Sequence, residues 1–200
     1  MFKAFKEAKL EKSLQNIEWI SITGIDNILL ETVDPLFIGI SATQKSDVAA
    51  KSVRKSELKA KTWVFAKVDG KTEIINPDFL TNSMRYSRGK DGKYKYNQIN
   101  ILAHLFTKDA FLKCAEFDIP YHRAFKKTNY INEEGMKIVV EEPNSFKFEK
   151  FIYDVFEYFE NFTLLEVNEE LEFGPIKSFK GNETPERALE MYLRKKSKTK

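Results

Sequence analysis

A two-residue turn between two alternating runs is the feature that most constrains this fold. Residues 63–68 and 71–75 alternate apolar with polar side chains, and Asp69-Gly70 separates them. Because Asp-Gly tolerates the positive φ angles of a tight turn, the two runs predict a pair of adjacent antiparallel strands. Any sheet that includes this hairpin is at least partly antiparallel.

The other patterned segments alternate between strand and helix character. Apolar, β-branched runs predict strands over 19–25, 96–106 and 162–167. Helical spacing or capping residues predict helices over 2–16, after Asp34-Pro35, near 108–116, over 146–159 and after Thr184-Pro185. The polar stretch 84–95 is expected to be a surface loop. Together these elements predict an α/β fold with a mixed sheet and flanking helices.

Positive charge is concentrated at the C-terminus. The 200 residues carry a net charge of +3, but five of the cations lie in the last seven residues, and the rest of the chain has a net charge of −2. We therefore expect one domain over 1–193 and a basic, disordered tail over 194–200. Salt-dependent nucleic-acid binding through this tail is the weakest functional hypothesis.

The cysteine and histidine content excludes several classes of protein. The single Cys114 cannot form an internal disulfide, and with only His104 and His122 it cannot build a zinc site from Cys and His pairs. Cys114 and His104 lie in apolar segments, where buried structural roles are expected. The single cysteine fits a reducing, cytoplasmic compartment. Because no apolar run is long enough to span a bilayer, we expect no membrane contact.

Three polar residues stand where a ligand could bind. Asp26 follows the first predicted strand, and its carboxylate suits Mg²⁺, although Asp26 or Asn27 could equally cap the next turn. Asn100 alternates with apolar residues, so its amide must bond to backbone or to a ligand. Lys177 lies on a loop after the 162–167 strand and could contact phosphate, although most loop lysines are solvated.

The order of these features resembles the C-terminal half of the UDP-sugar pyrophosphorylases, and most of all their UDP-N-acetylglucosamine branch. The matching segments read GIDNIL at 24–29, DP at 34–35, VDG at 68–70, NQINI at 97–101, PNSFKFEKF at 143–151 and EFGPIK at 172–177. Each motif alone is weak, but their order and spacing together are specific. The resemblance implies a Rossmann-like, GT-A-type nucleotidyltransferase fold.

The resemblance also implies a reaction. UTP and N-acetylglucosamine 1-phosphate would give UDP-N-acetylglucosamine and diphosphate, with Mg²⁺ as the cofactor. Carried over by position, Asp26 would bind the nucleotide and the metal. Lys147 and Lys177 would be the catalytic cations, with Lys147 on the nucleotide phosphates and Lys177 on the substrate. Asp26, Lys147 and Lys177 are therefore expected to converge on one polyanion. A sugar phosphate is already an anionic nucleophile at neutral pH, so the reaction needs no serine, thiol or histidine base.

The sugar-binding part implied by the resemblance departs from the family pattern. Asn100 would hold the sugar, and Phe151 and Tyr153 would line its pocket, although their spacing also fits core packing. Ile99 stands where the family has a glycine that lets a ligand approach closely. Asn76-Pro77 stands where the family has a Glu-Tyr pair that contacts the substrate.

The family's glycine-rich nucleotide loop has no counterpart in this sequence. We therefore expect a partial nucleotidyltransferase domain that lacks the N-terminal nucleotide-binding half and is inactive until that half is supplied. A separate N-terminal half or a second copy of the chain are the partners considered. Two alternatives stay open: a non-catalytic fragment or pseudoenzyme that acts as a binding module, and a relative of the UTP–glucose-1-phosphate uridylyltransferases.

Overall fold

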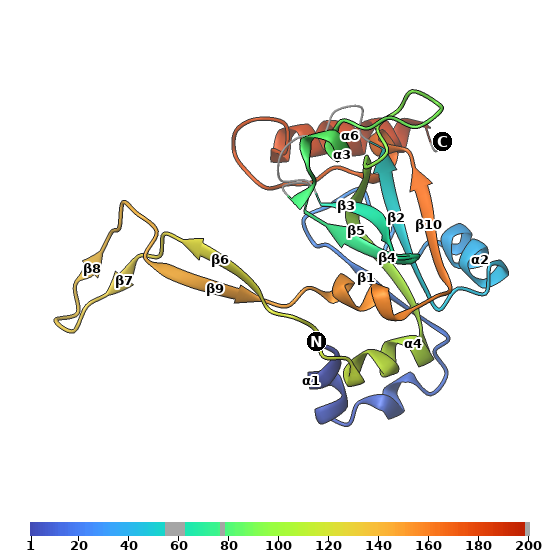
Figure 1. The fold of residues 1–200 in the computed structure, drawn as a ribbon, viewed down its shortest axis with the longest axis horizontal. Helices are drawn as coiled ribbons and strands as arrows, with labels where there is room; N and C mark the ends of the chain where they lie inside the picture. The colour runs from blue at the N-terminus through green and yellow to red at the C-terminus, as the bar shows by residue number, and fades with distance from the viewer. Residues whose placement is uncertain (55–62, 77–78, 199–200) are drawn as a thin grey trace.

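A six-stranded mixed sheet forms the centre of the protein (Figure 1). The structure, a computed structural model, describes residues 1–54, 63–76 and 79–198. The strands are β1 (Trp19–Thr23), β2 (Val48–Arg54), β3 (Val64–Val68), β4 (Lys71–Ile75), β5 (Gln98–Thr107) and β10 (Phe162–Val167). They lie in the order β10-β2-β5-β3-β4, and β1 also pairs with β5. Among the pairings of these described strands only that of β10 with β2 is parallel, so the predicted mixed sheet is confirmed.

The predicted hairpin is present as β3 and β4. Its turn residues, Asp69 and Gly70, have φ angles of 50° and 83°, the two positive values that a type I′ turn requires. At the other edge of the sheet β10 confirms the strand predicted over 162–167. Strand β2, which lies between β5 and β10, was not predicted because Ala, Lys and Ser weaken its apolar pattern.

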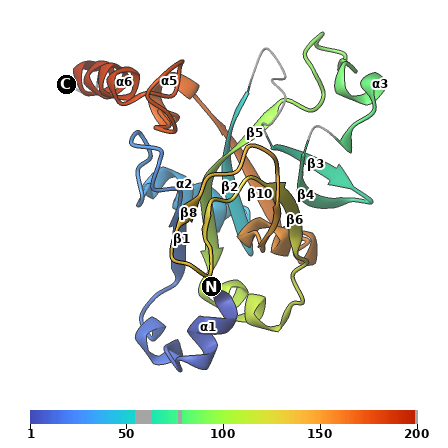
Figure 2. The same cartoon turned by 90° about the vertical axis from the view of Figure 1, so that its left-hand side faces the viewer.

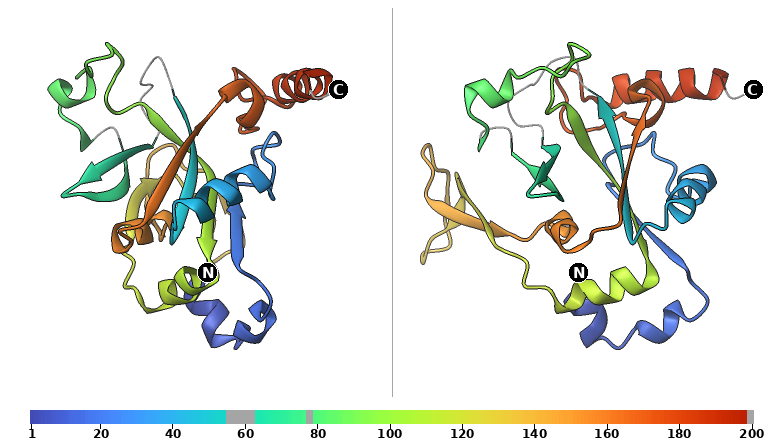
Figure 3. Two further views of the ribbon diagram at one scale, coloured as in Figure 1. Left: turned by 90° about the vertical axis from the view of Figure 1, so that its right-hand side faces the viewer. Right: turned by 45° about the vertical axis from the view of Figure 1, so that its right-hand side comes forward.

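Helical elements cover the two faces of the sheet and close its lower end (Figures 1 and 3). The elements are α1 (Phe2–Glu7), η1 (Glu11–Leu14), α2 (Pro35–Thr43), α3 (Asn82–Arg85), α4 (Lys108–Lys113), η3 (Cys114–Glu116), η4 (Ile152–Tyr158), α5 (Glu169–Glu172) and α6 (Pro185–Lys198). Asp34 caps α2 as predicted, since its side chain accepts from Leu36 N and Phe37 N. The single helix expected over 2–16 is wrong, because Lys9 has a φ of 53° and separates α1 from η1.

The core divides according to the alternation of side chains along β2. Val48 and Ala50 face the larger cluster, in which Phe106 of β5 packs with Phe156 of η4. Ala49 faces the other side, where Phe37 of α2 packs. Figure 3 shows α2 and η4 on opposite sides of the sheet. Cys114 is fully buried, as expected, and burial raises the pKa of its thiol to about 12.

An arm extends away from the sheet (Figure 1) and points toward the viewer in Figure 2. It consists of β6 (His122–Lys126) paired with β9 (Ser145–Glu149), and of β7 (Tyr130–Ile131) paired with β8 (Lys137–Ile138) at the tip. The helix predicted over 146–159 is therefore wrong in its first part. Phe146 pairs with Phe125 across the strands, their rings 4.8 Å apart, and a new 3-10 helix begins only after Phe151, whose N–H donates to Asp154.

The basic C-terminal segment was expected to be disordered from residue 194, and this is wrong for most of it. Helix α6 continues to Lys198. The Arg194 guanidinium pairs with Glu190 one turn earlier, and Lys195 Nζ donates to Leu29 O at 2.9 Å and pairs with Glu31 at 3.3 Å. These contacts favour helix over coil. No helix in the described ranges is both long and apolar enough to cross a bilayer.

Candidate functional site

Two loops meet at the carboxyl end of β1, one following β1 and the other following α5. Asn27 joins them: its Oδ1 accepts from Gly174 N, its Nδ2 donates to Glu172 O, and both distances are 2.8 Å. The same Oδ1 accepts from Leu29 N at 3.3 Å, so Asn27 also caps the next turn. Because Asn27 is only 6% exposed, these bonds are shielded from water and hold the two loops as one unit.

Asp26 and Lys177 lie side by side on these two loops. Ile176 N donates to Asp26 O at 2.8 Å, and Lys177 Nζ lies 3.9 Å from Asp26 Oδ2. Both side chains are partly exposed, Lys177 at 53% and Asp26 at 33%. The predicted proximity of these two residues is present, and the Lys177 ammonium keeps donors for a further acceptor. Their roles toward a ligand stay predictions.

Lys147 was expected to converge with Asp26 and Lys177, and the structure does not bring it there. It lies on β9 of the arm, opposite Ala124 of β6. Its Nζ contacts Glu149 Oε1 at 2.7 Å, and more than half of the side chain is exposed. The reason is local: its segment is a strand of the protruding arm, whereas a helix packed on the sheet was expected (Figure 1).

A bulge in β5 packs against the loop that carries Asp26. Residues 101–103 of β5 lie opposite a single residue of β2, and within them Leu102 has a φ of 54°, which is uncommon for a leucine. Gly24 N donates to Leu102 O at 2.8 Å. A Cβ on Gly24 would lie 2.9 Å from Asp26 Oδ1 and 3.1 Å from Leu102 Cβ. Glycine is therefore the residue that allows this close packing of loop on bulge.

Asn100 lies at the start of the same bulge. Its Oδ1 accepts from Leu102 N at 3.0 Å and lies 2.9 Å from His104 Nε2. His104 is buried, as expected, but its Nδ1 has no hydrogen-bond partner among the described residues. Burial lowers the pKa of His104 to about 3, so the ring is neutral at ordinary pH.

The two predicted aromatic residues belong to a wall of rings beside Asn100. Phe151 and Tyr153 stack with centroids 5.0 Å apart, and Trp63 meets Phe151 edge-on at 5.3 Å. The Tyr153 ring lies 6.4 Å from His104, the partner of Asn100. Tyr153 is buried in the main core and Phe151 packs against that core. The core-packing interpretation is thus confirmed for both, and the pocket role stays a prediction.

Two groups of paired ionisable side chains near the site lacked a clear signal in the sequence. His122 Nε2 of β6 lies 2.8 Å from Asp154 Oδ2. Lys51 of β2 is 1% exposed, and its Nζ contacts Asp34 Oδ2 at 2.6 Å and Glu172 Oε2 at 2.9 Å. Burial opposes ionisation of Asp34, but the Lys51 ammonium and the backbone donors of α2 still lower the pKa of that carboxyl. A lone lysine within VAAKSV was the only available hint.

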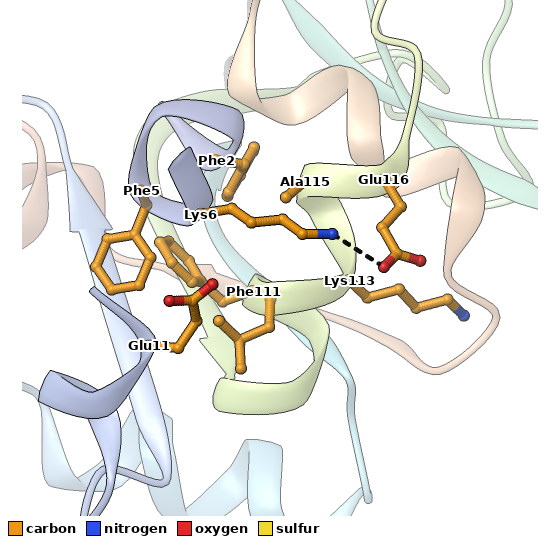
Figure 4. A pocket seen from close by; sticks show the side chains of 9 residues that line it. Phe2, Phe5, Lys6, Glu11, Phe111, Lys113, Ala115 and Glu116 are labelled. Atoms are coloured by element: carbon orange, nitrogen blue, oxygen red, sulfur yellow. Dashed lines mark hydrogen bonds and ion pairs between the residues drawn. The ribbon is translucent and has the colours of Figure 1, made fainter. Parts of the chain in front are cut away.

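One cavity among the described residues lies away from the candidate site. It measures about 290 Å³ and is formed by α1, η1 and α4 with η3, at the opposite end of the sheet from α6 (Figures 1 and 4). Phe2, Phe5 and Phe111 line it, and Lys6 pairs with Glu116 at its rim at 3.4 Å. A second cavity, about 100 Å³, lies between β1 and α2, with Asp34 and Lys51 in its wall.

Comparison with solved structures defines the class. The fold matches a mutant UDP-glucose pyrophosphorylase from Leishmania major in complex with UDP-glucose, with a TM-score of 0.62 at 15% identity over 88% of this chain and 38% of that one. The match to the Entamoeba histolytica protein named as a UDP-N-acetylglucosamine pyrophosphorylase is stronger. Its TM-score is 0.87 at 27% identity, over 96% of this chain and 49% of that one. The fold is that of the UDP-sugar pyrophosphorylases.

Sequence comparison narrows the relationship. The chain is 35% identical to human UDP-N-acetylhexosamine pyrophosphorylase-like protein 1 over 89% of its own length and 36% of that protein. It is 31% identical to UDP-N-acetylglucosamine pyrophosphorylase of Saccharomyces cerevisiae over 97% of its length and 43% of that protein. No family model matches the chain. The chain is thus a relative of the UDP-N-acetylglucosamine pyrophosphorylases, and it spans less than half the length of the curated relatives it matches.

Proposed function

We propose that this chain forms the sugar- and phosphate-contacting part of a uridylyltransferase that makes UDP-N-acetylglucosamine from UTP and N-acetylglucosamine 1-phosphate. The observation that carries the proposal is the juxtaposition of Asp26 and Lys177 on two interlocked loops. These residues come from distant parts of the sequence, yet they share one partly exposed surface at the carboxyl end of β1. In open α/β sheets, ligands bind at the carboxyl ends of the strands.

The chemistry of the pair suits transfer between phosphates. The attacking sugar phosphate is already anionic, so the enzyme must align two polyanions and neutralise charge as it moves toward diphosphate. The Lys177 ammonium would contribute one positive charge close to the phosphates. Asn100 would contact the sugar beside the wall formed by Phe151 and Tyr153. Lys147 would reach a phosphate only if the arm moved toward the body.

Mg²⁺ is the cofactor that we propose for this site. Among the described residues, no three His, Cys, Asp or Glu side chains gather into a group that could hold a metal ion by themselves. Asp26 would therefore supply one carboxylate to the ion. This fits Mg²⁺, which is usually held by one or two carboxylates together with substrate phosphates and water. When bound, the ion would neutralise part of the phosphate charge.

An N-acetylhexosamine 1-phosphate is the favoured substrate over glucose 1-phosphate. The match to the structure named for N-acetylglucosamine has a TM-score of 0.87 at 27% identity, whereas the matches to four structures named for UDP-glucose have TM-scores of 0.62–0.64 at 13–16% identity. The departure at Ile99 does not obstruct this proposal, because Ile99 is 2% exposed and packs with Val53 and Val64 in the core. Alternation along β5 directs it away from the face that carries Asn100.

The runner-up function is that of a non-catalytic binding module. It is favoured by Asn76-Pro77, which replaces the family's substrate-contacting pair; Pro77 lies outside the described residues. In either case the proposed partner is a separate N-terminal half or a second copy of the chain, and the proposed location is the cytoplasm.

A chimera separates the two functions. The aligned segment of the Saccharomyces cerevisiae relative is replaced by this chain, and formation of UDP-N-acetylglucosamine from UTP, the sugar phosphate and Mg²⁺ is measured. We expect the chimera to form UDP-N-acetylglucosamine. The rate should fall at least about tenfold when the chimera carries Asp26→Ala or Lys177→Ala. A folded chimera without turnover would favour the binding module instead.

A further inference from the structure

The orientation of the Asn100 side-chain amide is fixed by its two neighbours within β5. A backbone N–H can only donate, so the atom 3.0 Å from Leu102 N must be the Asn100 carbonyl oxygen. The same oxygen lies 2.9 Å from His104 Nε2. Since a carbonyl oxygen has no proton to donate, the hydrogen bond requires the proton to be on Nε2 of His104.

The surroundings of His104 agree with this tautomer. The residue is 1% exposed, and the rings of Phe156 and Tyr153 lie against it edge-on, with centroids 5.0 and 6.4 Å away. Its Nδ1 is buried and has no partner among the described residues. A protonated Nδ1 would be a buried donor without an acceptor, and a doubly protonated ring would be an unpaired buried charge, so both forms are disfavoured.

The amino half of Asn100 is left without a partner. Oδ1 takes part in the hydrogen bonds to Leu102 N and His104 Nε2, and within the part of the chain that the structure describes Nδ2 makes none. Asn100 is only half-buried, so a ligand can reach it. Rotation of the amide by 180° would place two N–H donors against Leu102 N and His104 Nε2–H, which neither group can accept.

We propose that His104 is a positioning residue: its protonated Nε2, together with Leu102 N, holds the Asn100 oxygen inside β5, so that Asn100 offers a ligand only the two donors of its Nδ2 group. The site therefore selects a ligand oxygen that accepts a hydrogen bond, such as an acetamido carbonyl or a sugar hydroxyl, and disfavours a group that can only donate. The sugar identity of that ligand rests on the proposed function; the tautomer and the amide orientation do not.

Nitrogen-15 NMR of the full chain tests the proposal directly. We expect His104 to show a proton on Nε2 and a bare Nδ1, with shifts that stay unchanged between about pH 5 and about pH 8. His104→Phe, which keeps a ring but lacks the donor, serves to assign the signals, and its thermal unfolding reports whether it folds. A proton on Nδ1, or a ring that titrates in this range, would overturn the proposal. This measurement needs no ligand.

Ligand binding provides the second measurement. UDP-N-acetylglucosamine is titrated into the folded chain and its Kd is followed by NMR. Asn100→Asp, which replaces donors by acceptors, is expected to weaken binding at least about tenfold; His104→Phe should weaken it about threefold or more, and His104→Gln, which retains an N–H donor, should restore part of the loss. Equal affinity in wild type and Asn100→Asp would contradict the donor role.

Absence of any binding by the wild type would count against the proposed function, while the tautomer measurement would still decide the positioning role.

Discussion

At the scale of single residues, a buried lysine connects the two loops of the candidate site. Asp34 lies after the loop that carries Asp26, and Glu172 lies before the loop that carries Lys177. The Lys51 ammonium contacts both carboxylates from within β2. Because all three groups are largely removed from water, loss of the cation would leave two acidic groups without compensation.

Lys51→Met tests this connection. The substitution keeps the length of the side chain but removes its charge, and we expect it to lower the free energy of unfolding by about 3–5 kcal/mol. Lys6→Met is the matched control, because the Lys6–Glu116 pair is exposed and should contribute less than about 1 kcal/mol. Urea unfolding of both variants measures the difference. Equal stability of the two would show that the buried ion triad does not hold the loops.

At the scale of elements, the end of β1 and the bulge of β5 form one packed unit. Gly24 approaches Leu102 so closely that no side chain fits between them, and the Asp26 carboxylate lies against the same point. Leu102 keeps a positive φ there. A strained backbone angle such as the φ of Leu102 persists where the surrounding structure enforces it. Leu102 lies between two predicted ligand-binding residues, Asn100 and Asp26.

Gly24→Ala should disturb this unit. We expect a loss of about 1–3 kcal/mol in stability and a displaced Asp26 carboxylate, since the new methyl group would meet Asp26 Oδ1 at 2.9 Å. The control is Gly39→Ala in α2, where a Cβ meets nothing within 4 Å; alanine there should be neutral or stabilise the helix by up to about 1 kcal/mol. Thermal unfolding compares the two, and a Gly24→Ala protein as stable as Gly39→Ala would contradict the packing described.

The elements that the sequence predicts well are those with local signals. The Asp69-Gly70 turn and the Asp34-Pro35 helix start depend on neighbouring residues, and both are confirmed. The first part of the segment 146–159 was misassigned because its apolar residues fit a helical period, while Phe146 pairs with Phe125, about 20 residues earlier in the sequence. Pairing with a strand that is distant in the sequence does not appear in the local periodicity of apolar residues.

The same distinction applies to the site. Asp26 and Lys177 were predicted together from the end of a strand, a loop and a family resemblance, and they do meet. The contacts of Lys51 and the pairing of Asn100 with His104 could not be predicted, because they depend on how the strands register. Convergence of Lys147 was predicted from the resemblance alone, and the arm places it elsewhere.

At the scale of the whole molecule, the sheet carries its candidate site at one end and the cavity lined by Phe2, Phe5 and Phe111 at the other, with the arm projecting from the side (Figure 1). Strand β1 pairs with β5 and with no other strand among the described residues. Its outer edge therefore offers backbone groups for pairing with another chain segment. This arrangement accords with a chain that spans less than half the length of its curated relatives.

The affinity of the chimera for diphosphate tests the central claim most directly. Binding is measured by calorimetry for the unmodified chimera, for Lys177→Met and for Lys67→Met, an exposed lysine of β3 outside the site. If Asp26 and Lys177 form a phosphate site, Lys177→Met weakens diphosphate binding about tenfold or more, while Lys67→Met binds like the unmodified chimera. Equal affinity of all three proteins would contradict the claim.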